Sequence, residues 1–214
     1  MTRVAWAAGH SVTVRTRGDG EPALLLAHGA GTDQDHPLIA GLAEAVAAAG
    51  ATCVTFNYPY TEAGRRRPDR QEKLLECHRA VAEWLRTRHA GPLVLAGRSM
   101  GGRMASYLAS EGYPAEALVL YAYPLHPAGR PERLRFDHLP HIDVPVLFFQ
   151  GSRDALSRAE LFDRLVRPLP GVRVFDLEGA DHSFRVRGLS REDVNDLLAA
   201  ETVSWMRTVF ADPP

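Results

Sequence analysis

Residues suited to nucleophilic catalysis occur in a distinctive order along the chain. Ser99 lies in the pattern Gly-x-Ser-x-Gly, between an apolar run and a predicted helix. A serine hydroxyl is a weak nucleophile at neutral pH, so it needs a histidine base that a carboxylate orients. Asp154 and His182 each come just after a later predicted strand. The three residues predict acyl transfer, with Ser99 as nucleophile, His182 as base and Asp154 as orienting acid.

The glycines around Ser99 suit a nucleophile held on a sharp turn. Gly97, Gly101 and Gly102 have no side chains, so a strand and a helix can pack closely around strained backbone. The turn leads into a helix N-terminus, where free N–H groups stabilise a developing negative charge. We therefore expect the backbone N–H of Met100 to donate to the oxyanion.

A second oxyanion donor is expected from the glycine-containing loop "HGAG" at residues 28–31, which follows an early apolar strand. The N–H of Ala30 is the first choice and that of Gly31 the second. The same stretch contains a cluster of histidines and aspartates, namely His28, Asp33, Asp35 and His36. Their spacing matches no zinc pattern, so a solvated turn with a helix cap is the favoured interpretation and no metal site is predicted.

Other interpretations of these residues stay open. Asp154 could be a turn former or a helix cap, and Asp181 is a rival acid beside His182. The side chains of adjacent residues point apart, so the Asp181 carboxylate would be poorly placed to orient the imidazole of His182. The remaining histidines in predicted helices and loops, His78, His126, His138 and His141, are expected to be packing or surface residues.

Substrate contacts are harder to predict than the catalytic residues. Candidates beside the expected site are Gly31, Tyr58, Arg98 and Tyr123, although core packing explains the tyrosines equally well. The basic run Arg65, Arg66 and Arg67 is typical of a solvated loop. If that loop overhangs the site, it could attract a carboxylate or phosphate of the substrate.

The order of elements predicts a parallel sheet with helices on both faces, because apolar strands alternate with helical patterns. The predicted strands are residues 11–16, Ala23–Ala27, 51–58, Leu93–Ala96, Ala117–Ala122, Val144–Gln150 and Val172–Leu177. The predicted helices are His36–Ala49, Asp69–Arg88, Met100–Ser110, Arg158–Arg167 and Arg191–Val209. The irregular segment 124–144 is too short for a helical lid, so an open site is expected.

Length and composition indicate one domain over residues 1–214, of which 45% are hydrophobic. With 25 basic and 26 acidic residues, the chain lacks the excess of positive charge that binds nucleic acid or an anionic membrane. No signal peptide or membrane helix is predicted, so we expect a cytoplasmic protein. Cys53 and Cys77 fall in buried elements, which favours free thiols in a reducing compartment.

The motifs "GRSMGGRMAS", "HGAGTDQDHP", "PVLFFQGSRD" and "GADHSF" give the chain a resemblance to the α/β-hydrolase superfamily over nearly its full length. More narrowly, it resembles the small lidless branch near the dienelactone hydrolases, with the testis-expressed hydrolase-like proteins and a subunit of the non-specific-lethal complex. The resemblance implies a mostly parallel sheet of about eight strands without a large cap domain. It also places Ser99, Asp154 and His182 at the triad positions, and the Met100 and Ala30 backbones at the oxyanion hole. Dienelactone hydrolases proper use cysteine where this chain has serine.

These observations predict a serine hydrolase that cleaves small-molecule carboxylic esters or thioesters of small acyl groups without a cofactor. Peptidase or acyltransferase activity through the same triad is a second possibility. A non-catalytic binding or scaffold protein with the same fold is a third, because a fold alone does not fix function.

Overall fold

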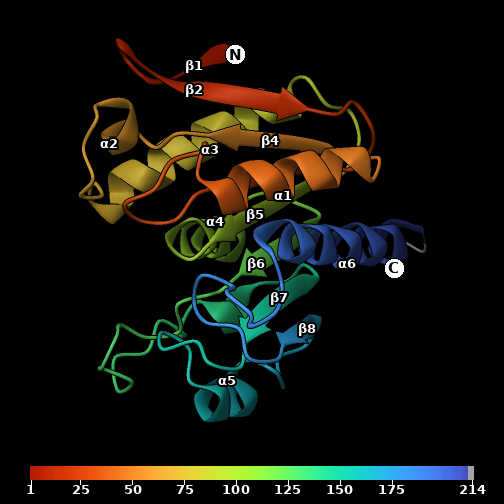
Figure 1. The fold of residues 1–214 in the computed structure, drawn as a ribbon. Coiled ribbons are helices and arrows are strands. Elements are labelled where there is room, and N and C mark those ends of the chain that lie inside the picture. Colours follow the sequence, from red (N-terminus) through yellow and green to blue (C-terminus); the bar gives the residue numbers. More distant parts are fainter. Residues whose placement is uncertain (212–214) are drawn as a thin grey trace.

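A computed structural model of the protein describes residues 1–211. The strands in this range are β1 (Thr2–Ala7), β2 (His10–Arg17), β3 (Ala23–Ala27), β4 (Thr52–Phe56), β5 (Leu93–Arg98), β6 (Ala117–Tyr121), β7 (Val146–Gly151) and β8 (Val172–Leu177). They form one eight-stranded sheet in the order β1-β2-β4-β3-β5-β6-β7-β8 (Figure 1). The β1–β2 and β2–β4 pairs are antiparallel, whereas the pairs from β4 to β8 are parallel. The predicted sheet is confirmed.

Helices cover both faces of this sheet (Figure 1). They are α1 (Pro37–Ala48), α2 (Pro59–Glu62), α3 (Gln71–Arg86), α4 (Met100–Ser110), α5 (Ala159–Leu165) and α6 (Arg191–Ala211). Helices α1 and α6 pack together on one face, and α3 and α4 on the other. Between β6 and β7 the chain forms only a short 3-10 turn, Leu139–His141, so residues 1–211 include no large cap domain.

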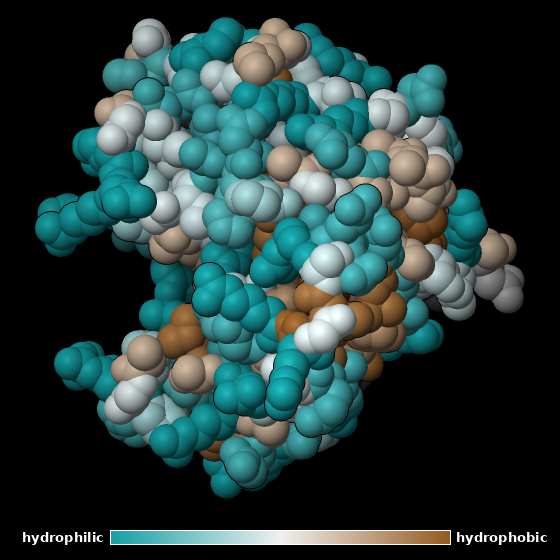
Figure 2. Space-filling model, viewed as in Figure 1, coloured by the Kyte–Doolittle hydropathy of each residue, from teal (hydrophilic) through white to brown (hydrophobic). Residues whose placement is uncertain are grey.

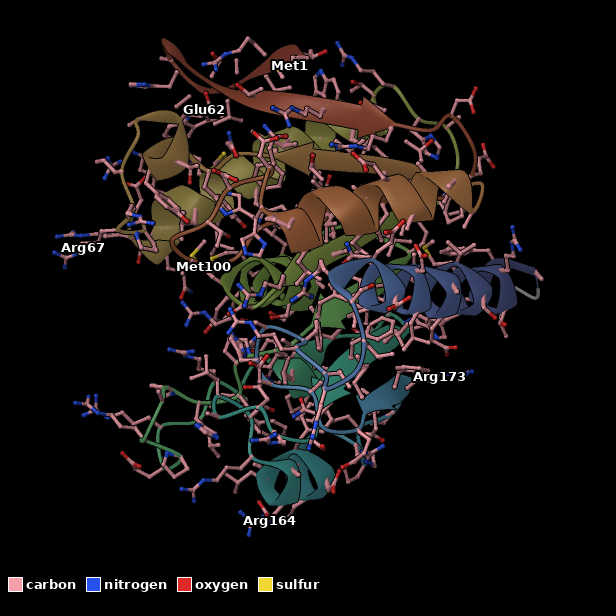
Figure 3. All side chains as sticks on the ribbon, viewed as in Figure 1. Met1, Glu62, Arg67, Met100, Arg164 and Arg173 are labelled. Carbon is pink, nitrogen blue, oxygen red and sulfur yellow. The ribbon has the colours of Figure 1, made fainter. Side chains whose placement is uncertain are left out.

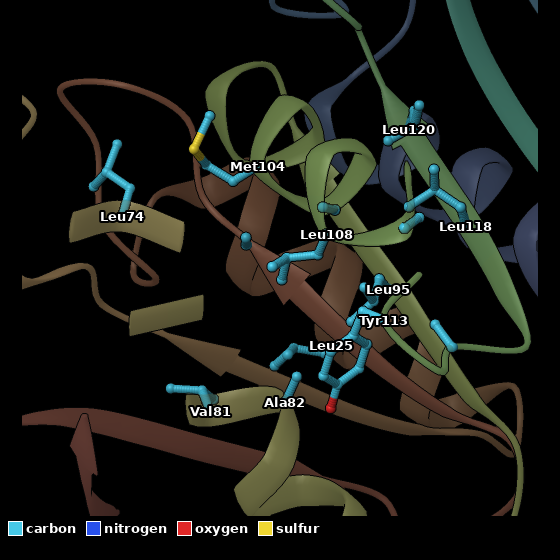
Figure 4. Close-up of a cluster of buried hydrophobic side chains, with 14 of the residues drawn as sticks. Leu25, Leu74, Val81, Ala82, Leu95, Met104, Leu108, Tyr113, Leu118 and Leu120 are labelled. Atoms are coloured by element: carbon cyan, nitrogen blue, oxygen red, sulfur yellow. The ribbon is translucent and has the colours of Figure 1, made fainter. Parts of the chain in front are cut away.

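The central strands are buried on both faces, which explains their unbroken apolar runs. In β3, Leu24 and Leu26 belong to the core beneath α1 and α6, while Leu25 belongs to the core beneath α3 and α4. Alternate side chains of a strand point to opposite faces, so both faces of β3 must be apolar. Figure 4 shows Leu25 in the same cluster of buried side chains as Leu108 of α4.

The carboxyl ends of β3, β5, β7 and β8 lie at one edge of the sheet, because these strands run in the same direction. The loops that follow these strands contain the predicted catalytic residues. Figure 2 shows the molecule hollowed on this side, between the part with α2 and the part with residues 122–145. Met100 lies at the same side in Figure 3.

Cys53 and Cys77 are both buried and free, as predicted. None of the helices in residues 1–211 combines the length and the apolar character needed to span a membrane.

Candidate active site

Ser99 occupies a strained turn between β5 and α4. Its backbone has φ 52° and ψ −112°, a left-handed conformation that costs a residue with a side chain about 1–3 kcal/mol. The Ser99 N–H donates to the carbonyl of Tyr121 on the neighbouring strand at 2.9 Å, which helps to hold the turn. Such strain is retained where the surrounding structure enforces it, often at functional sites.

The neighbouring glycines are required by close backbone packing. A β-carbon on Gly97 would collide with the backbone of Gly101 and Gly102, and one on Gly101 would collide with the carbonyl oxygens of Ala27 and His28. The start of α4 therefore rests directly against the end of β3. This contact brings the first N–H groups of α4 next to the loop of residues 28–31.

A continuous chain of hydrogen bonds joins the three predicted catalytic side chains. The Oγ of Ser99 lies 2.9 Å from Nε2 of His182, and Nδ1 of His182 lies 2.8 Å from Oδ2 of Asp154. The Asp154 side chain is fully buried, whereas that of His182 is 20% exposed. The structure thus brings together three residues that are far apart in the sequence.

Asp154 also forms the turn that the sequence suggested as an alternative. Its Oδ1 accepts the N–H of Leu156 at 2.7 Å, while Oδ2 faces His182. One carboxylate therefore makes both contacts. The bond to Leu156 fixes the carboxylate in the orientation that His182 requires.

Asp181 has a different position from Asp154. Its Oδ1 accepts the backbone N–H groups of Ser183 at 2.8 Å and Arg185 at 3.0 Å. Phe184, next in this turn, has φ 53° and is fully buried. Asp181 thus shapes the backbone around His182, and its hydrogen bonds are to that backbone.

Residues 1–211 contain three positions other than glycine with positive φ, and all of them adjoin this site. They are Ser99, Ala122 and Phe184. Ala122 follows Tyr121, whose carbonyl binds Ser99, and Phe184 lies two residues after His182. Backbone strain is therefore concentrated around the Ser99–His182 pair.

His28 is part of the protein framework beneath the loop of residues 28–31. Its Nδ1–H donates to the Gly29 carbonyl at 2.8 Å, and its Nε2 accepts the N–H of Tyr58 at 3.1 Å. Burial lowers the pKa of His28 to about 4, so the ring is neutral at physiological pH. His36 caps α1 by accepting the N–H of Leu38, which confirms the helix cap predicted in this turn.

Two predicted substrate contacts lie in the core instead. Tyr58 and Tyr123 are fully buried; the Tyr58 hydroxyl lies 3.1 Å from Nδ1 of His78, and the Tyr123 hydroxyl donates to the carbonyl of Arg135 at 2.7 Å. The burial of both side chains favours core packing, the alternative that the sequence left open, over a role in walling the acyl pocket.

Arg98 is also turned inward, contrary to its prediction as a substrate contact. It is 8% exposed, and its Nη2 donates to the His182 carbonyl at 3.1 Å. Burial lowers the pKa of Arg98 below its ordinary value.

Arg191, which the sequence did not single out, donates to the Ser183 carbonyl at 2.9 Å. No local pattern could have indicated it, since its role depends on where α6 begins relative to the His182 loop.

The loop of the basic run adjoins the predicted oxyanion loop. The Arg66 carbonyl lies 3.9 Å from where a β-carbon on Gly31 would be. Arg65 pairs with Asp69 at 2.8 Å, and Arg67 extends outward from the molecule (Figure 3). Ala30 and Gly31 are both exposed in the turn.

A second serine–histidine pair lies in the interior. Ser106 Oγ lies 2.8 Å from Nε2 of His138 and donates to the Arg103 carbonyl, but Ser106 is fully buried. Burial lowers the pKa of His138 to about 4. This pair connects segment 122–145 to α4.

A cavity of about 350 Å³ near Leu139 and Leu169 lies at the opposite ends of β7 and β8 from the triad.

Comparisons with known proteins agree with the fold. The family model described as an alpha/beta hydrolase domain matches residues 20–209. The protein Est1E from Butyrivibrio proteoclasticus, with ferulic acid bound, is 14% identical with a TM-score of 0.80, over 99% of this chain and 100% of that one. A dienelactone hydrolase from Anabaena variabilis is 21% identical, with a TM-score of 0.73 and 95% of each chain covered.

A serine hydrolase without a lid from Xanthomonas campestris is 22% identical, with a TM-score of 0.69, over 91% of this chain and 88% of that one. At these identities the similarity concerns the fold. The narrower likeness to testis-expressed and non-specific-lethal proteins stays a prediction. The dienelactone hydrolase and the lidless neighbour have the fold expected of the branch that the sequence resembles. The family match establishes that this chain belongs to the alpha/beta hydrolase family.

Proposed function

We propose that this hydrolase is a serine esterase or thioesterase that cleaves carboxylic esters or thioesters of small acyl groups. The observation that carries the proposal is the unbroken hydrogen-bonded chain from Ser99 through His182 to the buried Asp154. Membership of the alpha/beta hydrolase family supports the general reaction.

In the proposed reaction, His182 Nε2 takes the proton of Ser99 Oγ as that oxygen attacks the carbonyl carbon of the ester. The tetrahedral intermediate collapses, and the alcohol or thiol leaves with the proton from His182. Water then gives a proton to His182 and attacks the acyl group on Ser99. Collapse of this second intermediate releases the carboxylic acid and restores the hydroxyl of Ser99.

Asp154 would keep His182 in the tautomer that leaves Nε2 free to accept the proton. Its Oδ2 lies 2.8 Å from Nδ1 of His182, so Nδ1 has to carry a hydrogen. The carboxylate also stabilises the imidazolium that forms when His182 is protonated.

Met100 and Ala30 are the proposed oxyanion donors. Met100 is the first residue of α4, and the first N–H groups of a helix have no acceptor within it. The Gly29 carbonyl accepts from His28 and, at 2.9 Å, from the Thr32 hydroxyl. Because N–H and C=O point in opposite directions across a trans peptide, these bonds direct the Ala30 N–H away from the framework.

The preference for small acyl groups rests on the open architecture. Long acyl chains are usually bound in deep apolar pockets. Residues 1–211 include no large cap domain that could enclose such a chain. Tyr58 and Tyr123 are buried in the core, so their rings do not line a pocket for it.

Hydrolysis of p-nitrophenyl esters of increasing chain length tests this proposal. We expect the acetate and butyrate to be turned over with the highest kcat/KM, and Ser99→Ala to lose at least about 10³-fold of kcat. Ser110→Ala, at the other end of α4, is the matched control. Undiminished activity in Ser99→Ala would contradict the serine mechanism, and a preference that rises to the octanoate would contradict the small acyl group.

A further inference from the structure

Arg98 contacts three segments of the proposed catalytic site at once. It directly precedes Ser99, and its Nη2 donates to the carbonyl of His182 at 3.1 Å and, at 3.4 Å, to the Ser183 hydroxyl. On another side it packs under the oxyanion loop, because a β-carbon on Gly29 would lie 2.8 Å from Nη1 and 3.3 Å from Cδ of Arg98.

This guanidinium is buried without a carboxylate partner among the residues that the structure describes. Asp154 and Asp181 act on it only through longer-range electrostatic attraction, and its Nε has no hydrogen-bond partner in the same residues. Burying a charge without an ionic partner is energetically unfavourable. Its direct hydrogen-bond acceptors are the carbonyl and hydroxyl of the segment that contains His182.

The His182 segment needs such an attachment because no regular element fixes it. Residues 178–190 form a loop between β8, which is the edge strand of the sheet, and α6. The catalytic nitrogen must nevertheless lie within hydrogen-bond distance of a serine that is 83 residues away in the sequence. Arg191 holds the same loop from α6, through the Ser183 carbonyl.

We propose that Arg98 is a positioning residue, whose guanidinium fixes the backbone of His182 relative to Ser99 and supports the oxyanion loop at Gly29. The inference rests on the proposed serine mechanism and goes beyond it. Arg98 links the nucleophile strand to the base, so that the Ser99–His182 distance does not depend on the loop alone. Arg191 is the second attachment of the same segment.

If Arg98 positions His182, removal of its guanidinium should lower the rate of the chemical step and leave the amount of folded protein unchanged. A misplaced base lowers the rate by about 10²-fold. We therefore expect Arg98→Ala to lower kcat about 10²-fold per active serine, with KM changed by less than about threefold. Active serines are counted by exhaustive fluorophosphonate labelling and folded protein by circular dichroism.

Rescue of the variant separates positioning from a purely structural role. Millimolar guanidinium chloride should restore part of kcat in Arg98→Ala and leave the wild type unchanged. Arg98→Lys keeps a positive charge and a hydrogen-bond donor, but the ammonium group differs in geometry from the guanidinium. The kcat of this variant should therefore lie between those of the wild type and Arg98→Ala. Arg187→Ala removes an exposed arginine from the same loop and should leave kcat and KM unchanged.

Arg191→Ala provides a second variant if Arg98→Ala does not fold. It removes one attachment while Arg98 stays, and we expect about a tenfold lower kcat at unchanged KM. Wild-type kcat per active serine in Arg98→Ala would overturn the inference; so would wild-type kcat in Arg191→Ala if the Arg98 variant is unfolded. A wild-type protein with no esterase activity and no labelling would instead overturn the proposed function, and the inference with it.

Discussion

Asp154 and His182 are joined by a 2.8 Å contact between Oδ2 and Nδ1, although they follow different strands. The two strands, β7 and β8, are parallel neighbours whose last paired residues are Gly151 and Leu177. Each residue therefore leaves the sheet at the same edge, a few residues beyond that pair. The pairing of the acid and the base is a direct consequence of the strand register.

Asp154→Asn should lower kcat by about 10³–10⁴-fold, because an amide no longer favours the tautomer with a free Nε2 and no longer stabilises the imidazolium. The shape of the side chain and its bond to the Leu156 N–H are retained, so the protein should fold. Ester hydrolysis at saturating substrate measures the loss.

Asp181→Asn is the matched control for this prediction. The amide oxygen can still accept from the Ser183 and Arg185 N–H groups, so kcat should change by less than about threefold. A larger loss in Asp181→Asn than in Asp154→Asn would show that the acid has been misassigned.

The sequence was sufficient to predict the central sheet and the grouping of Ser99, Asp154 and His182. The buried strands have apolar residues on both faces, and the carboxyl ends of parallel strands meet at one edge. β1 was not predicted, since Val4 is its only buried residue and no apolar run marks it.

The sequence could not predict in which direction a side chain points at the end of a strand. Tyr58 and Tyr123 could equally well have lined the site or the core, and packing against His78 and residues 135–138 decides for the core. The role of Arg98 depends on a contact across 84 residues of sequence, which no local pattern encodes.

Tyr58→Phe tests the placement of Tyr58 in the core. The substitution removes the hydroxyl that pairs with His78 Nδ1, and a buried nitrogen without a partner costs about 1–3 kcal/mol. We expect urea denaturation to show this loss of unfolding free energy, while KM for the butyrate ester changes by less than about twofold. A raised KM at unchanged stability would place Tyr58 in the substrate site after all.

The buried histidines should make the protein sensitive to mild acid. Burial lowers the pKa of His78 from 6.5 to about 3 and that of His28 to about 4. Between pH 6.5 and these values the unfolded chain binds protons that the folded chain does not. Stability is therefore full above pH 6.5 and falls as pH decreases, by up to about 1.4 kcal/mol per pH unit for His78.

Urea denaturation of His78→Asn at pH 7 and pH 5 measures this contribution. Asparagine can place a polar atom near the position of Nδ1 but does not titrate, so the variant should lose less stability than the wild type between the two pH values. His10→Asn, at an exposed position in β2, should decline like the wild type. An equal decline in His78→Asn would rule out His78 as a source of the acid sensitivity.

Fluorophosphonate labelling followed by intact mass measurement and peptide mapping tests whether Ser99 is the nucleophile, because the reagent reacts with serines activated as nucleophiles. We expect one adduct per chain, located on Ser99, with no adduct in Ser99→Ala and much slower labelling in His182→Ala. Folded wild-type protein that remains unlabelled, or an adduct on a residue other than Ser99, would show that Ser99 is not the nucleophile.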